Sequence, residues 1–407
     1  MNCRHCYAPL QYDFLDLGYA PPSNAYLDFS DLTKPEKYYP LRVKVCNHCW
    51  LVQTEDHAQA NELFCADYAY YSSTSSGWLS HAENYSKTIT QRLKLDENSF
   101  VIEIAANDGY LLKFFVSAGI PCLGIEPTAG TAAAAKRLGI QVLQEFFSEK
   151  LGLQLVANHQ QADLIIGNNV YAHVPDINDF TRGLKAALKP GGTITLEFPH
   201  LLQLIERNQF DTIYHEHFSY LSLHVVERIF KVCGLRIWEI EKLATHGGSL
   251  RVYGCHDEDE RNTSSSVDSV LAEETHGGLQ SMSVYRSLQA RADQTKNSLL
   301  SFLIEKKLAG KSVAAYGAAA KGNTLLNYAG IKPDLLPWVC DAALAKQGKF
   351  LPGSHLPIVP PAVLSDQRPD YLLILPWNIA TEIMQQNSAL ADLGTKFVIA
   401  VPDLKIL

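Results

Sequence analysis

The chain has 407 residues and a formal net charge of −8, with 47% hydrophobic and 19% charged residues. These values predict a soluble globular protein of two or three domains, and the acidic charge argues against a nucleic-acid partner, which would need a basic face. The sequence has neither an apolar run of about twenty residues nor a basic, apolar leader, so we expect no membrane span and no secretion signal.

Two Cys-x-x-Cys motifs lie in the first fifty residues and are formed by Cys3, Cys6, Cys46 and Cys49. Four thiolates suit a tetrahedral zinc ion, and a site filled by four cysteines leaves no open position for catalysis. We therefore expect structural zinc in a small domain over residues 1–65, with two disulfides or unrelated thiols as the alternative. His5 and His48 lie inside the motifs and are the alternative ligands. The other five cysteines are scattered, which indicates core residues in a reducing cytoplasm.

The segment Asp67–Trp78 is rich in hydroxyl groups and aromatic rings. Tyr68 and Tyr70 are suited to lining a pocket for a polar ligand. The alternative is a polar linker before a helix, with Ser75 or Ser76 as its N-cap.

Phe100–Ala105 is a short apolar run that predicts a buried parallel strand, and Asn107 to Gly109 supply the tight turn that follows. Tyr110–Ala118 is then expected to be a helix. Strand, turn and helix together open a doubly wound α/β domain, whose ligands bind at the carboxyl ends of the strands. The acid Glu103 near the end of the strand suits the positively charged methionine end of S-adenosylmethionine (SAM). Because the usual first two glycines of such a turn are replaced here, an ordinary strand–turn–helix without a ligand is the alternative.

Later elements favour SAM. A second strand, Pro121–Ile125, ends in Glu126, whose carboxylate can accept both ribose hydroxyls. Asp163–Gly167 is a later strand followed by two asparagines, and Leu188–Thr193 is a turn common before the fifth strand of SAM-dependent methyltransferases. The predicted SAM-binding residues are Glu103, Asn107, Gly109, Glu126 and Asn168.

Two segments carry titratable groups where chemistry is expected. The first, Gly167–His173, follows the fourth strand; the second, Thr212–Leu221, follows the fifth by a short helix-like passage and contains Tyr-His-Glu-His. A metal site is disfavoured because two histidines two positions apart on a helix diverge by about 200° and no third ligand is evident. A general base with an orienting carboxylate fits better. A hydrogen-bonded core cluster is the alternative.

The carboxyl-terminal third contains further strands. Two of them, Leu235–Glu241 and Gly247–Cys255, are expected to complete the methyltransferase sheet, which gives a domain over residues 66–257. Residues 258–407 are expected to form a helical connection, with a long helix over Leu279–Leu308, and a second doubly wound domain. Its predicted parallel strands are Lys311–Tyr316, Trp338–Asp341, Tyr371–Leu375 and Phe397–Val401.

The turn after the first of these strands, Gly317–Thr324, is not a P-loop. Small residues that open a helix can still cradle a diphosphate, and Lys321 could add a point charge. The alternative is a packing turn with a surface lysine.

The chain resembles the sugar C-methyltransferases that act on nucleotide-linked 4-keto deoxysugars. The resemblance lies in the order of five features: the two Cys-x-x-Cys motifs (the cysteine knuckles), Tyr68–Tyr70, Glu103–Gly109, Gly167–Val174 and Tyr214–Tyr220. The resemblance spans essentially the whole chain, and Tyr-His-Glu-His is its most specific part. It implies that His217 is the base and that the carboxyl-terminal lobe helps to hold the nucleotide-sugar. The other active-site residues that follow are Tyr214, Glu216, His173 and Tyr68, with Asn169, Tyr70, Lys321 and Gly317 on the substrate.

The chemistry expected of these parts is C-methylation. A ketone at C4 acidifies the C3 hydrogen, neutral His217 removes it, Tyr214 or a neighbouring donor stabilises the enolate, and C3 attacks the sulfonium methyl. We expect a cytoplasmic SAM-dependent 3-C-methyltransferase of an NDP-4-keto-6-deoxysugar, a monomer or weak dimer without nucleic-acid or membrane partners. Alternatives are an O- or N-methyltransferase on the same sugars, a zinc-ribbon RNA methyltransferase, and a nicotinamide redox enzyme using the Gly317 turn.

Overall fold

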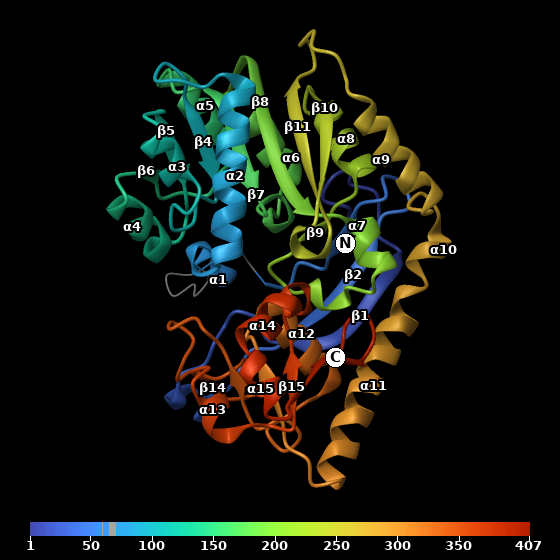
Figure 1. The fold of residues 1–407 in the computed structure, drawn as a ribbon. Coiled ribbons are helices and arrows are strands. Elements are labelled where there is room, and N and C mark those ends of the chain that lie inside the picture. The colour runs from blue at the N-terminus through green and yellow to red at the C-terminus, as the bar shows by residue number, and fades with distance from the viewer. Residues whose placement is uncertain (59, 65–70) are drawn as a thin grey trace.

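The computed structural model describes residues 1–58, 60–64 and 71–407, and these residues form three sheets (Figure 1). Each sheet is the centre of one lobe. A four-stranded sheet belongs to the amino-terminal lobe, a seven-stranded sheet to the central lobe and a six-stranded sheet to the carboxyl-terminal lobe. The fold is therefore a Rossmann-like α/β core with a small amino-terminal domain and a second doubly wound domain.

The amino-terminal sheet is antiparallel and has the strand order β1-β2-β3-β9. Alternate side chains of β2, namely Leu41, Val43 and Val45, are buried, as expected of a sheet with one face on a core. Its fourth strand comes from the middle of the chain. The bounds are β1 (Tyr12–Ala20), β2 (Tyr39–Val45), β3 (Val52–Thr54) and β9 (Ser219–Tyr220), and a short helix α1 (Ala60–Leu63) follows β3.

The central sheet has the order β10-β11-β8-β7-β4-β5-β6. Its strands are parallel except for the two at the edge, which are antiparallel to their neighbours. The strands are β4 (Val101–Ile104), β5 (Cys122–Ile125), β6 (Gln141–Leu143), β7 (Ala162–Asn168), β8 (Leu188–Pro199), β10 (Leu235–Leu243) and β11 (Ser249–His256).

Helices cover both faces of this sheet, as its nearly continuous apolar strands require. Alternate strand residues enter two different cores, Val101 with α2, α3 and α4, and Ile102 with α5, α6 and α8. These helices are α2 (Ser76–Leu93), α3 (Leu112–Ser117), α4 (Ala129–Arg137), α5 (Glu149–Ala157), α6 (Ile177–Ala187) and α8 (Leu223–Val232). Helix α7 (Leu201–Glu206) follows β8 and packs instead into the core shared by the amino- and carboxyl-terminal sheets. Ser75 is the N-cap of α2 and accepts a hydrogen bond from the Trp78 amide.

Two local predictions are corrected. The helix expected from Tyr110 begins only at Leu112, because the preceding residues complete the turn. The turn expected over Leu188–Thr193 lies within strand β8. A register shift between β7 and β8 opposite Ala162 absorbs the extra residues.

The carboxyl-terminal sheet has the order β14-β13-β12-β15-β16-β17, parallel except for the last strand. Its strands are β12 (Val313–Tyr316), β13 (Val339–Cys340), β14 (Ile358–Val359), β15 (Tyr371–Ile374), β16 (Lys396–Ile399) and β17 (Lys405–Ile406). Its helices are α12 (Ala320–Ala329), α13 (Val363–Gln367), α14 (Ala380–Gln386) and α15 (Ser388–Asp392).

The helical connection runs from the central to the carboxyl-terminal lobe along one side of the molecule (Figure 1). It consists of α9 (Ser265–His276), α10 (Met282–Tyr285) and α11 (Leu288–Leu308). The single helix expected over Leu279–Leu308 is therefore wrong. The break lets Tyr285 enter the core, where its ring stacks on Trp50 at 6.1 Å and its hydroxyl donates to the Leu279 carbonyl.

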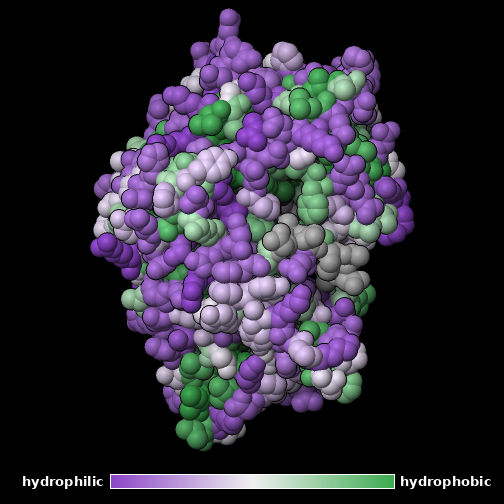
Figure 2. Space-filling view, turned by 180° about the vertical axis from the view of Figure 1, so that it is seen from behind, coloured by the Kyte–Doolittle hydropathy of each residue, from purple (hydrophilic) through white to green (hydrophobic). Residues whose placement is uncertain are grey.

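Among the described residues, no helix combines the length and apolar character needed to cross a membrane. The face seen from behind is mostly hydrophilic, with hydrophobic residues gathered in separate patches (Figure 2).

Candidate active site

The four cysteines of the knuckles form one cluster. Their sulfur atoms all lie within 4.8 Å of one another, and the Cys3–Cys49 and Cys6–Cys46 sulfurs are 3.5 Å apart. A tetrahedral zinc ion with bonds of about 2.3 Å would space its sulfurs about 3.8 Å apart, so the residues fit the metal. His5 instead contacts the Asn178 side chain of α6 at 2.8 Å, and neither His5 nor His48 belongs to the cluster.

A cavity of about 790 Å³ lies where the three lobes meet. Most of its lining comes from the loops that follow strands β4, β5, β7 and β8, which is the edge where ligands of doubly wound sheets bind. The amino-terminal lobe contributes Asn24, and the carboxyl-terminal lobe contributes Lys321 and Asn378. One cavity therefore has room for a cofactor and a second ligand.

The loop after β4 is held in the shape that glycines usually provide. Ala105 and Asn107 both have left-handed backbone angles, with φ of +57° and +50°. Such angles are strained for residues with a side chain and cluster at functional sites. Gly109 has φ of +81°, and a Cβ there would lie 2.5 Å from Ile140, so it shapes the turn without lining the cavity.

Glu126 lines the cavity at the end of β5. One carboxylate oxygen accepts the Asn107 amide at 2.9 Å and the other accepts the Thr128 amide at 2.9 Å. The Asn107 side-chain oxygen in turn accepts the Ser72 amide, and Tyr110 lines the same wall. These contacts fix the two loops around the expected adenosyl position.

Glu103 is placed differently from the expectation. It lies inside β4, is 1% exposed and does not line the cavity. Burial raises the pKa of its carboxyl group well above the ordinary value, and the neighbouring acids Asp108 and Glu126 add to that effect. Because strand residues alternate between the two faces, Glu103 points into the helix-covered core and does not face a cofactor in the cavity.

Asn168 provides the clearest sign of a ligand. It lines the cavity, is 8% exposed, and both polar atoms of its side chain lack a hydrogen-bond partner within the described residues. A buried amide without partners is costly, so such a group is expected to bind a ligand. Its neighbour Asn169 lines the cavity as well and contacts His246 Nε2 through its side-chain amide at 3.2 Å.

A short helical passage, α7 and the 3₁₀ segment Phe210–Thr212, follows β8 as expected, and His217 lies in the turn between that segment and β9. Its Nδ1 lies 2.8 Å from the Thr212 carbonyl oxygen. Since a carbonyl can only accept, Nδ1 carries the proton and Nε2 carries the lone pair. Burial lowers the pKa of His217 well below its ordinary value, and nearby His173 lowers it further. The ring is therefore neutral at neutral pH.

Three further side chains of the predicted cluster line the cavity with His217. The His173 ring lies 4.7 Å from that of His217, and burial lowers the pKa of His173 to about 4. The Tyr214 ring lies 4.0 Å from His217. Glu216 is 2% exposed, and both its carboxylate oxygens accept hydrogen bonds from Asn24. His215 points away, toward the Pro40 carbonyl.

Lys321 opens helix α12 and lines the cavity, so it is not the surface lysine of the alternative reading. Its ammonium donates to the Asn378 side-chain oxygen at 2.8 Å and lies 5.0 Å from the Trp377 ring. Burial lowers the pKa of Lys321, and Asp211 acts in the opposite direction. Gly317 does not line the cavity. Its φ is +92°, and a Cβ there would lie 2.4 Å from Pro376.

Several lining residues were not predicted from the sequence, among them Asn24, Trp78, His81 and His246. His246 has φ of +53° and lies in the turn between β10 and β11, where the two glycines that follow it were a signal. The predicted site residues Tyr68 and Tyr70 lie outside the described residues.

His81 belongs to a buried charged cluster beside the cavity. Its Nε2 lies 2.9 Å from the Glu197 carboxylate, which also accepts a hydrogen bond from Arg251 at 2.8 Å. Although burial acts to raise it, the pKa of Glu197 falls to about 2 because of His81 and Arg251. The Glu197–Arg251 ion pair joins β8 to β11 and holds His81, which lines the cavity.

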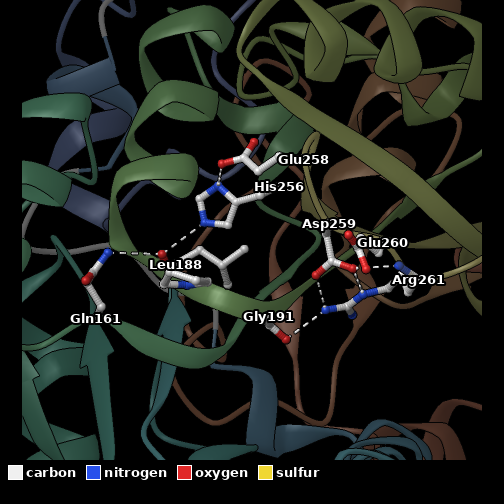
Figure 3. Close-up of a pocket in the computed structure, with 9 residues that line it drawn as sticks. Gln161, Leu188, Gly191, His256, Glu258, Asp259, Glu260 and Arg261 are labelled. Atoms are coloured by element: carbon white, nitrogen blue, oxygen red, sulfur yellow. Dashed lines mark hydrogen bonds and ion pairs between the residues drawn. The ribbon is translucent and has the colours of Figure 1, made fainter.

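A second pocket, of about 460 Å³, lies at the opposite, amino-terminal end of the central strands (Figure 3). Its polar groups already bind one another. Arg261 donates to the Asp259 carboxylate and to the Gly191 carbonyl, and His256 contacts the Leu188 carbonyl. It contains none of the predicted site residues.

Comparison with known proteins matches three successive segments of the chain to three different domain families. Family profiles match a zinc binding domain over residues 3–64, a methyltransferase domain over 78–240 and a C-methyltransferase C-terminal domain over 244–402. The C-methyltransferase NovU of Streptomyces niveus is 31% identical over 406 residues, which cover 100% of this chain and 96% of that protein.

Solved structures are more distant. A SAM-dependent methyltransferase of Anabaena variabilis is 14% identical with a TM-score of 0.35, covering 42% of this chain and 83% of its own. The magnesium protoporphyrin IX methyltransferase of Synechocystis, with bound SAM, is 13% identical with a TM-score of 0.32, covering 42% of this chain and 78% of its own.

Proposed function

The chain belongs to the SAM-dependent C-methyltransferases with a zinc-binding amino-terminal domain, and from this membership we propose that it methylates C3 of an NDP-4-keto-6-deoxysugar. The observation that carries the proposal is His217. It is a neutral, buried imidazole with its Nε2 lone pair available, in the same cavity as the unpartnered Asn168 amide. Methylation of carbon needs such a base, whereas methylation of a hydroxyl or amine depends on it less.

SAM supplies an electrophilic methyl group. In the proposal, the side chain of Asn168 binds its methionine end, and Glu126, Asn107 and Tyr110 enclose its adenosyl end. Gly109 keeps the turn tight enough for this arrangement.

His217 Nε2 takes the C3 proton of the sugar, which the C4 ketone has made acidic. The Tyr214 hydroxyl is the donor proposed for the enolate oxygen, as its ring lies against His217. His173 and Glu216 complete the cluster, and Tyr68 is proposed beside them. Enclosure in the cavity holds C3 within attack distance of the methyl group.

The carboxyl-terminal lobe is proposed to hold the nucleotide end of the substrate. Lys321 and Asn169 face the cavity, and the proposed set also includes Tyr70 and the turn at Gly317. We also propose domain boundaries at residues 1–65, 66–257 and 258–407. Strand β9 lies within the second of these ranges but pairs in the sheet of the first. The proposed location of the protein is the cytoplasm.

The test is a reaction with SAM and a panel of NDP-4-keto-6-deoxyhexoses in deuterated water, followed by mass spectrometry and NMR. We expect a product heavier by one methylene with the new methyl on C3, and deuterium at C3 of recovered substrate. A methyl found on oxygen or nitrogen would favour the alternative sugar methyltransferase. Absence of product with the whole panel would contradict the proposal and lead to an RNA methylation assay.

A further inference from the structure

The segment that carries His217 is part of the amino-terminal sheet. Strand β9 begins two residues after His217 and pairs with β3, with Val52 opposite Tyr220 and Gln53 opposite Ser219. Thr54 extends this contact, because its amide donates to the Phe218 carbonyl at 3.1 Å and its hydroxyl donates to the His217 carbonyl at 3.1 Å. The backbone of His217 is therefore bonded directly to the metal-binding lobe.

The preceding residue of β3 reaches the cysteine cluster. Gln53 is fully buried, its side-chain amide donates to Cys3 Sγ at 3.2 Å, and its side-chain oxygen accepts the Arg4 amide at 2.9 Å. The Arg4 guanidinium in turn donates to the Thr54 carbonyl at 3.1 Å. Contiguous hydrogen bonds thus join a metal ligand to the backbone of His217.

A second contact from the same lobe reaches the neighbouring residue. Asn24 donates to both oxygens of Glu216, at 2.8 and 2.9 Å. The segment that carries Asn24 is itself fixed to the carboxyl-terminal lobe, since the Tyr26 hydroxyl donates to the Ala318 carbonyl at 2.7 Å. Asn323 of α12 also donates to the Ser23 carbonyl. The amino-terminal lobe consequently holds the Tyr214–His217 turn through two sets of hydrogen bonds, from Thr54 to His217 and from Asn24 to Glu216.

We propose that the amino-terminal lobe positions the base, with Gln53 and Thr54 coupling the cysteine-bound metal to the placement of His217. This rests on the proposed role of His217. Thr54 is then a positioning residue, and the metal domain does more than stabilise the fold. A displacement of about 1 Å in a reacting group can cost about 10²-fold in rate, so one lost contact at this backbone is expected to be visible in kcat.

The half of the cavity predicted to bind SAM does not share these contacts. Asn107 and Glu126 are held by central-lobe loops and by the amide of Ser72. Loss of the Thr54 contact is therefore expected to separate two properties, because the base moves while the SAM site stays intact.

The first experiment compares Thr54→Val with the matched control Thr33→Val. The control removes a hydroxyl-to-carbonyl bond of the same kind, from Thr33 to Ser30, at an exposed position of the same lobe. For Thr54→Val we expect full zinc content, SAM affinity within about twofold of the parent, a kcat roughly tenfold lower and faster amide hydrogen exchange over residues 214–220. The control should match the parent in all four.

The second variant, Gln53→Met, keeps the side-chain length and removes both hydrogen bonds. We expect zinc to pass faster to a colorimetric chelator and exchange over residues 214–220 to rise in parallel. Unchanged exchange at 214–220 in both variants would overturn the proposal. Zinc content and exchange need no sugar substrate, so this failure is distinguishable from a failure of the proposed reaction, in which only the methylation assay is negative.

Discussion

The two ends of the cavity are assembled in different ways. The end predicted to bind SAM lies at one edge of the central sheet, where Asn107 and Glu126 follow parallel strands and Asn168 is the last residue of one. The end that holds the proposed base draws on all three lobes, with Asn24, His217 and Lys321 coming from one each. The first end depends on short-range geometry, whereas the second exists only when distant segments meet. Substitutions should therefore affect one end without the other.

The largest separation is expected from His217→Asn. Asparagine can keep the hydrogen bond to the Thr212 carbonyl but has no basic nitrogen, so we expect kcat to fall roughly 10³-fold with SAM affinity nearly unchanged. Single-turnover rates and calorimetric SAM titration measure the two quantities. His276→Asn, an exposed change on α9, is the control. Retention of most activity in His217→Asn would remove it as the base.

Asn168→Ala should weaken SAM binding and leave proton abstraction intact, which is the opposite of the pattern expected for His217→Asn. The size of the effect should also be smaller. If the unpartnered amide of Asn168 binds the cofactor, its loss removes about 1–3 kcal/mol of binding, or roughly 5- to 150-fold in the SAM dissociation constant. Deuterium exchange at C3 of the substrate, catalysed by His217, should persist when it is assayed at saturating SAM. Asn262→Ala, an exposed loop change, is the control. Unchanged SAM affinity would show that Asn168 serves the substrate or the fold.

The same contrast between the two ends of the cavity explains which of its residues could be predicted from the sequence. Asn107, Glu126 and Asn168 were predictable because the carboxyl ends of parallel strands meet at one edge. Glu103 was misplaced because the alternation of its strand turns it into the core. Asn24 left no pattern at all, since its hydrogen bond to Glu216 joins residues 192 positions apart.

Other misses have similar causes. The break before α11 follows from the burial of Tyr285 against Trp50, a contact between distant segments that helix periodicity does not contain. His217 was predicted to be the base through a resemblance, and that role is a proposal. The pairing of its segment with β3 was not predicted, because a strand of two residues is too short to give a periodic signal.

Lys321→Met tests whether the carboxyl-terminal lobe serves the substrate. We expect the KM for the nucleotide-sugar to rise about tenfold, since a charged hydrogen-bond donor that lines the cavity is lost, with SAM affinity unchanged. Lys405→Met on the exposed edge strand β17 should leave both values as they are. A fall in kcat with constant KM would instead place the ammonium at the reacting atoms.

The smallest effect is expected from pH, and its sign follows from burial. The pKa of His173 is lowered to about 4, whereas in the unfolded chain it has its ordinary value near 6.5. Between these values the unfolded chain binds a proton that the folded protein does not. The free energy of unfolding should therefore be unaffected above about pH 7 and decrease as pH falls from 6.5 toward 4.

Thermal denaturation at successive pH values should show this decrease, and His173→Phe should make it shallower. The exposed His159→Asn variant is the control and should keep the parental slope. An unchanged slope in His173→Phe would mean that other groups govern acid stability. Catalysis should follow the same logic at His217, whose lowered pKa keeps the base unprotonated and active below pH 6.5.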